Sequence, residues 1–172
     1  DAGSTRLGDM SETTKTDLRL EAYATVDEAN ALLGVCIAAG LDDDVAALLT
    51  RIQNDLFDVG ADLCTPVVPD PKYPPLRIEQ DYIDRLEGWC DHYNEDLPAL
   101  RSFILNGGAL ASAELHVARA RGGRAGRAGW AARRPGSGAR RKIFDIEAMP
   151  RQQFKAEVIP GLEPQQRFPE SR

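Results

Sequence analysis

The feature that most constrains this chain is an apolar stripe that recurs every three or four positions between residues 42 and 63. Its members are Val45, Leu48, Leu49, Ile52, Leu56, Val59 and Leu63. This spacing places the side chains on one face of an α-helix. The helix is expected to end at Thr65-Pro66, because proline cannot continue it. A helix with one apolar face is stable only when that face is covered, so the stripe predicts a packed domain.

Three further segments show the same helical period. They span about residues 17–39, residues 78–93, and the stretch from Gly107-Gly108 to Ala120. Asp17 is suited to cap the start of the first segment, and Gly40 is suited to cap its end. No alternating strand pattern accompanies these long segments and short links. We therefore predict an all-α fold, an up-and-down bundle of four helices, with a fifth left open by the last residues.

The chain changes character near residue 120. Residues 1–118 contain 8 lysines and arginines against 22 acids, whereas residues 119–142 contain nine cations and no acid. Six glycines lie between Gly122 and Gly138, and each disfavours a helix by roughly 0.5–1 kcal/mol relative to alanine. We predict a helical domain over residues 1–120, followed by an atypical Arg/Gly-rich and Pro-containing tail over residues 121–172.

The composition of this tail suggests a hypothesis about its origin. Arginine, glycine, alanine and proline all have codons that begin with two G or C bases, so a shift of reading frame in a GC-rich gene produces this mixture. We hypothesise that the chain leaves its ancestral frame near Ala120. The encoding DNA tests this idea, because a neighbouring frame should then encode a helical continuation.

Several functional classes are disfavoured by composition. The chain has no run of eighteen apolar residues, so we expect no membrane span. Its three cysteines, Cys36, Cys64 and Cys90, are odd in number and lack CxxC or Cys/His spacing. This pattern predicts neither a disulfide framework nor a protein-bound metal, and it fits a reduced, cytoplasmic setting.

Three polar patterns are candidates for chemistry. In residues 1–8, glycines and hydroxyl side chains can direct N–H and O–H groups at phosphate oxygens, although a plain chain terminus has the same composition. Tyr23, Asp27 and Asn30 share a helix face, which indicates either a solvated surface or a binding surface. Residues 55–62 carry an acidic stripe, to which we assign no catalytic role and which we interpret as facing solvent or an interface. The stripe consists of Asp55, Asp58 and Asp62.

Longer motifs carry a family resemblance. Residues 99–119 read A-L-R-S-F-I-L-N-G-G-A-L-A-S-A-E-L-H-V-A-R, residues 21–30 read E-A-Y-A-T-V-D-E-A-N, and residues 51–63 read R-I-Q-N-D-L-F-D-V-G-A-D-L. These stretches closely resemble the motifs of PduO-type ATP:cob(I)alamin adenosyltransferases. The resemblance covers about residues 1–120, with scattered matches to Arg127. Asn106 departs from a family proline, and Gly123 stands where the family has the first arginine of an R-R pair.

The resemblance implies a function and a set of site residues. The function is transfer of the 5′-deoxyadenosyl group of ATP to cob(I)alamin, with Mg²⁺, giving adenosylcobalamin and triphosphate. Asp27 and Arg119 are implied as a catalytic pair across a subunit boundary of a homotrimer, and Phe103 as the corrinoid contact. The implied ATP-binding residues are Gly3, Ser4, Thr5, Lys15, Arg124 and Arg127.

The departures from the family lead us to expect reduced activity in this chain. An arginine lost at position 123 removes one charge-assisted phosphate contact, worth roughly 1.5–3 kcal/mol. One alternative is a non-catalytic helical module that binds corrinoid or nucleotide. Another is a helical domain whose basic tail binds nucleic acid. We favour nucleic acid less, because Trp130 is the one aromatic residue within residues 119–142.

Overall fold

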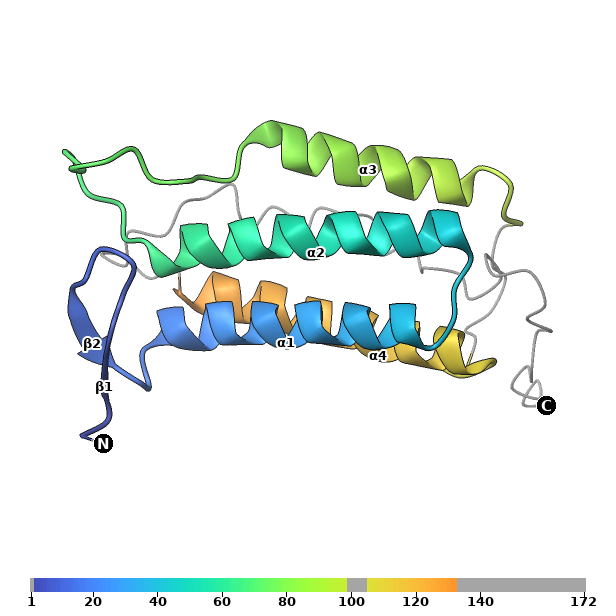
Figure 1. Cartoon of the computed structure of the whole chain (residues 1–172), viewed down its shortest axis with the longest axis horizontal. Helices are drawn as coiled ribbons and strands as arrows, with labels where there is room; N and C mark the ends of the chain where they lie inside the picture. Colours follow the sequence, from blue (N-terminus) through green and yellow to red (C-terminus); the bar gives the residue numbers. More distant parts are fainter. Residues whose placement is uncertain (1, 99–104, 133–172) are drawn as a thin grey trace, which may run out of the picture.

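The computed structural model describes residues 2–98 and 105–132 of the 172-residue chain. A hairpin of two short strands precedes four helices, which run alternately up and down (Figure 1). The elements are β1 (Ser4–Arg6), β2 (Glu12–Thr14), α1 (Leu18–Ala38), α2 (Asp43–Cys64), α3 (Gln80–Asn94) and α4 (Leu110–Ala132). The predicted all-α bundle of four helices is confirmed. The fifth helix that was left open would fall outside the described residues.

The hairpin is a feature that the sequence pattern did not predict. Each strand has three residues, which is too short for an alternation of apolar and polar residues to be visible. The hairpin lies at the end of the bundle where α1 begins and where α2 and α4 end (Figure 1).

The ends of α1 and α2 follow the local chemistry of the chain. The Asp17 side chain caps α1 by accepting the Arg19 N–H, as predicted. The C-cap of α1 is Ala39 rather than Gly40, and Gly40 follows with a φ of +90°. Glycine adopts this left-handed conformation without strain. Thr65 caps the end of α2, which confirms the predicted stop.

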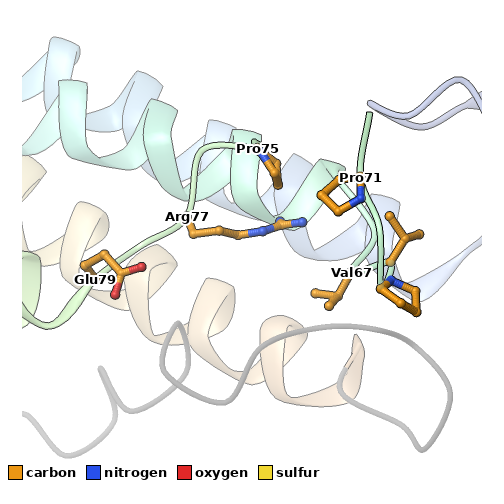
Figure 2. A pocket seen from close by; sticks show the side chains of 7 residues that line it. Val67, Pro71, Pro75, Arg77 and Glu79 are labelled. Atoms are coloured by element: carbon orange, nitrogen blue, oxygen red, sulfur yellow. The ribbon is translucent and has the colours of Figure 1, made fainter. Parts of the chain in front are cut away.

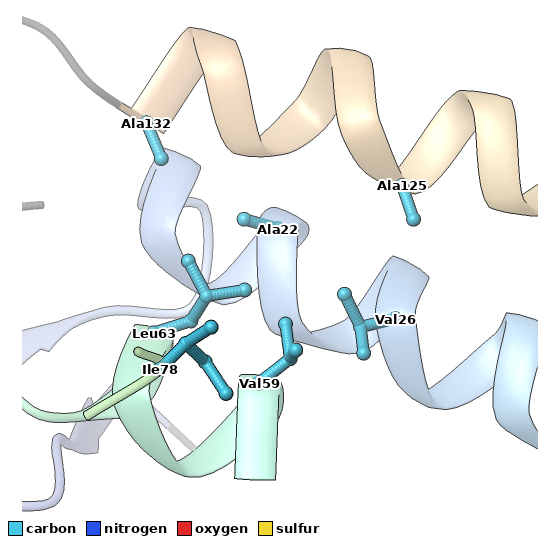
Figure 3. Close-up of a cluster of buried hydrophobic side chains, with 7 residues drawn as sticks. All are labelled: Ala22, Val26, Val59, Leu63, Ile78, Ala125 and Ala132. Atoms are coloured by element: carbon cyan, nitrogen blue, oxygen red, sulfur yellow. The ribbon is translucent and has the colours of Figure 1, made fainter. Parts of the chain in front are cut away.

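The core lies mainly between α1, α2 and α4, and α1 packs closely against both of the others. One buried cluster lies near the hairpin (Figure 3), and a second surrounds Cys36 at the other end. The first cluster consists of Ala22, Val26, Val59, Leu63, Ile78, Ala125 and Ala132. Its members come from sequence-distant segments, so their burial fixes the relative position of the helices.

Helix α4 continues to Ala132, well beyond the change in composition at residue 120. Its buried residues beyond that point are Ala125, Gly129 and Ala132, and Ala125 and Ala132 pack with Ala22 of α1. Such small side chains let two helix backbones approach closely, and the packing offsets the low helix propensity of glycine. Residue 120 is therefore not a helix end, and the division into a domain and a tail stays a prediction.

Helix α3 and the segment before it contact α2 through a set of polar side chains, and Tyr82 and Tyr93 of α3 also pack against the two apolar clusters. The acidic stripe of α2 faces α3, with Asp55 and Asp62 buried and Asp58 half-buried. The partners are Arg85 for Asp55, Tyr82 for Asp58, and Arg77 with the Ile78 amide for Asp62. The stripe was expected to face solvent or an interface, and the solvent-facing alternative is wrong, because basic and hydroxyl groups from residues 77–85 cover it.

Candidate functional site

The β1–β2 hairpin brings four of the predicted ATP-binding residues together. Thr5 pairs with Thr13 in the antiparallel ladder, and Ser4 pairs with Thr14. Gly3 has a φ of +73°, and its carbonyl accepts the backbone N–H of Lys15 at 2.8 Å. A side chain at Gly3 would be strained, because L-residues rarely adopt that φ. The hairpin therefore places a left-handed glycine, two hydroxyl groups and a lysine in one small region.

Helix α4 presents the predicted arginines on exposed positions. Arg119, Arg124 and Arg127 are all exposed. The Arg124 Nη2 atom lies 3.3 Å from Oε1 of Glu21, in the first turn of α1. This ion pair places Arg124 near the start of α1, and hence near the hairpin that precedes it. Arg127 lies over Gly123, because a Cβ built at Gly123 would be 3.6 Å from the Arg127 Nη1 atom.

A further ion pair was not identified from the sequence. Arg121 lies 3.0 Å from Glu28 of α1. Arg121 falls in the segment that we assigned to a tail, and no lysine or arginine lies within four positions of Glu28 along the chain. Their pairing depends on the antiparallel packing of α1 and α4, so no local sequence signal reveals it.

Asp27 and Arg119 are not brought together within one chain. Both side chains are exposed, Asp27 on α1 and Arg119 on α4. Among the described residues, their carboxylate and guanidinium groups form no ion pair with each other. The other predicted site residue, Phe103, lies outside the described residues.

His116 is buried on α4, one turn before Arg119. Burial lowers the pKa of His116, and the charge of Arg119 lowers it further. Its Nε2 atom makes no hydrogen bond in the described part of the chain. The lowered pKa favours the neutral imidazole at pH 7.

A separate hollow of about 440 Å³ opens in the loop before α3 (Figure 2). It is lined by Val67, Val68, Pro69, Pro71, Pro75, Arg77 and Glu79. None of the predicted site residues lines it. The guanidinium of Arg77 is engaged by Asp62 and by the carbonyls of Thr65 and Pro66. This arginine is therefore committed to holding the loop rather than to binding an anion.

The fold and these contacts define a class: a helical bundle with a glycine- and hydroxyl-bearing hairpin beside a row of exposed arginines. The model of the cobalamin adenosyltransferase family matches residues 1–146. The chain belongs to the cobalamin adenosyltransferase family. This match extends beyond residue 120, where we had expected the resemblance to fade. The reading-frame hypothesis remains a prediction for the encoding DNA.

Relatives and solved structures agree with this assignment. The chain is 61% identical over 133 residues to the corrinoid adenosyltransferase of Mycobacterium tuberculosis, covering 77% of this chain and 69% of the relative. It is also similar to a phenylalanine-to-alanine variant of a PduO-type ATP:corrinoid adenosyltransferase from Lactobacillus reuteri, complexed with cobalamin and ATP. That comparison has a TM-score of 0.73 and 31% identity, and covers 83% of this chain and 78% of the other. An arginine-to-lysine variant of the Lactobacillus reuteri enzyme, complexed with ATP, gives a TM-score of 0.72 at 31% identity, with 86% and 81% coverage.

Proposed function

We propose that this chain transfers the 5′-deoxyadenosyl group of ATP to cob(I)alamin, giving adenosylcobalamin and inorganic triphosphate. The observation that carries this proposal is the 61% identity to a corrinoid adenosyltransferase over most of the chain. The solved relatives, one complexed with cobalamin and ATP and one with ATP, add support.

The chemistry needs no nucleophile from the protein. The Co(I) centre of the substrate attacks C5′ of the ribose, a cobalt–carbon bond forms, and the bond from C5′ to the triphosphate oxygen breaks. Its electron pair leaves with the triphosphate. The protein must therefore hold the two substrates in line and stabilise the charge that develops on the leaving group.

The hairpin and the end of α4 are suited to hold ATP. Gly3, Ser4 and Thr5 supply backbone and hydroxyl donors to phosphate oxygens, and Lys15 adds a cation. Arg124 is placed near them by Glu21, and Arg127 follows on the next turn of α4. Guanidinium groups suit this role because they bind phosphate oxygens in a forked geometry.

Mg²⁺ fits this site as a companion of the nucleotide. In the part of the chain that the structure describes, no three His, Cys, Asp or Glu side chains gather as a metal site. Mg²⁺ is commonly held by substrate phosphates and water with one or two carboxylates. When bound with ATP, the ion would neutralise part of the triphosphate charge.

A homotrimer would complete the site. Asp27 and Arg119 are both exposed and do not pair within the chain, so each is available to a partner subunit. A carboxylate–guanidinium pair between subunits would fix their relative register. For this arrangement we assign the nucleotide contact to Arg119 and the corrinoid contact to Phe103.

Two further expectations complete the proposal. Gly123 removes one arginine from the phosphate-binding row, so we propose a turnover below that of relatives with an R-R pair.

None of the described helices is long and apolar enough to cross a bilayer, and we propose that the chain acts in the cytoplasm.

The experiment that tests the function uses the full chain with Mg-ATP and chemically reduced cobalamin. Formation of adenosylcobalamin is followed by its absorption spectrum. Arg119→Ala should abolish most of the turnover, whereas Arg51→Ala should not, because Arg51 is an exposed arginine elsewhere, on α2. If corrinoid and ATP bind without product, the chain is a non-catalytic binding module. If neither binds, the assignment is wrong.

A further inference from the structure

The β1–β2 hairpin needs an anchor outside itself. It has only two strands of three residues each, and an isolated two-stranded hairpin is marginally stable in water. Of its residues between Ser4 and Thr14, none is fully buried. Its position must therefore be set by contacts with the bundle.

The first contact is made by the turn of the hairpin. The backbone N–H of Gly8 donates to the carbonyl of Cys64 at 3.0 Å, in the last turn of α2. The last carbonyls of a helix have no partner within it, so they accept donors from elsewhere. The end of α2 is thus a natural attachment point for the hairpin.

The second contact joins β2 to the start of α1. Asp17 accepts the Thr13 hydroxyl at 2.8 Å and, through its other oxygen, the Arg19 N–H at 2.7 Å. These two hydrogen bonds, the Arg19 one first, lower the pKa of Asp17. The hairpin and the first turn of α1 are therefore fastened by one ionised carboxylate.

The third contact is made by Arg19, which joins the start of α1 to the end of α2. Its side chain is almost fully buried, with 6% of the residue exposed, and its Nη1 atom donates to the carbonyl of Leu63 at 2.7 Å. A cation at a helix C-terminus is favoured by the helix dipole. Leu63 and Cys64 are adjacent, so Arg19 and Gly8 attach α1 and the hairpin turn to the same end of α2.

We propose that Arg19 is a positioning residue for the nucleotide end of the site. It fixes the start of α1 on α2, and through Asp17 and Gly8 this sets where the hairpin meets the triphosphate. Glu21 lies two residues further along α1 and holds Arg124, so the same turn places both the hairpin and an arginine of α4. This inference rests on the proposed function.

The test compares Arg19→Met and Arg19→Lys with the wild-type chain. We expect Arg19→Met to raise the KM for ATP about tenfold, equivalent to about 1.4 kcal/mol. The kcat and the KM for cob(I)alamin should change less than about twofold, because binding rather than chemistry is affected. Arg19→Lys keeps the charge and should recover part of the loss.

Arg85→Met is the matched control. Arg85 is also largely buried and donates to Asp55 from α3, but it lies away from the hairpin. A general loss of stability would raise the KM for ATP in both variants. A rise in Arg19→Met alone supports the proposal, whereas an equal rise in both, or none in Arg19→Met, overturns it.

Amide hydrogen exchange of the ligand-free chain gives an independent readout. Exchange in residues 4–14 should accelerate in Arg19→Met and stay unchanged in Arg85→Met. Unchanged exchange in Arg19→Met would overturn the anchoring role. If the wild-type chain neither binds ATP nor forms adenosylcobalamin, the proposed function fails, and the exchange data still decide whether Arg19 holds the hairpin.

Discussion

Replacing glycine by alanine should raise the stability of the folded chain at some positions and lower it at others. Gly122 lies in α4, and a Cβ built there meets no atom within 4 Å. At Gly123 the nearest atom is the Arg127 Nη1 at 3.6 Å, an ordinary van der Waals distance. Neither residue has a left-handed backbone. Alanine should therefore stabilise α4 by about 0.5–1 kcal/mol at each position.

Gly40 is the matched control, because a Cβ has open space there just as it does at Gly122. A Cβ there also meets nothing within 4 Å, but its φ is +90°. A left-handed backbone disfavours alanine by roughly 1–2 kcal/mol. The pair Gly122→Ala with Gly123→Ala should add about 1–2 kcal/mol to the free energy of unfolding. For a chain of this size that corresponds to a Tm increase of about 2–8 °C, and Gly40→Ala should lower the Tm.

Urea denaturation followed by circular dichroism measures these changes at constant temperature. A shift of the midpoint with an unchanged slope reports a change in stability without a change in the compactness of the unfolded state. A lower midpoint for Gly122→Ala would refute the reasoning, since it would mean that residue 122 is not in an unstrained helix. A higher midpoint for Gly40→Ala would refute the role given to its backbone conformation.

Three further predictions concern charged groups. Gly123→Arg should tighten Mg-ATP binding about tenfold in titration calorimetry by adding a charge-assisted contact; unchanged affinity would count against phosphate binding there. Arg77→Met should lower the free energy of unfolding by about 3–5 kcal/mol, because it removes the cation that pairs with Asp62. Asp62 is only 3% exposed, so water cannot replace that partner. A loss under about 1 kcal/mol, which is the range of exposed ion pairs, would contradict this prediction. Burial, aided by Arg119, lowers the pKa of His116 in the folded chain, so the unfolded chain takes up the proton first as the pH falls. Stability should therefore decrease from about pH 6.5 downward, and denaturation of His116→Gln should lack that component.

The sequence predicted the bounds of α1 and α2 equally well, and the segment expected over about residues 17–39 matches α1 within one residue at each end. The stripe over residues 42–63 matches α2 within one residue at each end. Helix α3 begins two residues later than expected, because Ile78 is buried in the preceding extended segment rather than on the helix. Apolar periodicity records that a side chain is buried, but not which element buries it.

The length of α4 and the attachments of the hairpin could not be predicted in the same way. The buried face of α4 beyond residue 120 is built from Ala125, Gly129 and Ala132, which a hydrophobic pattern does not register. The partners of Arg19 and Arg124 lie 44 and 103 residues away along the chain. Such contacts follow from the packing of helices, so they become visible only once the fold is known.

The polar attachment of α3 has a consequence for how the molecule opens. Within α3, all of which the structure describes, Ile83 is the one buried residue, and Tyr82 and Tyr93 are half-buried against the core clusters. The other three helices share hydrocarbon contacts that are lost only when the bundle comes apart. Helix α3 should therefore behave as a separate cooperative unit that detaches and returns while the remaining three stay folded. Native-state hydrogen exchange would then divide the backbone amides into two groups. The amides of α3 would exchange through an opening of lower free energy than the amides of α1, α2 and α4.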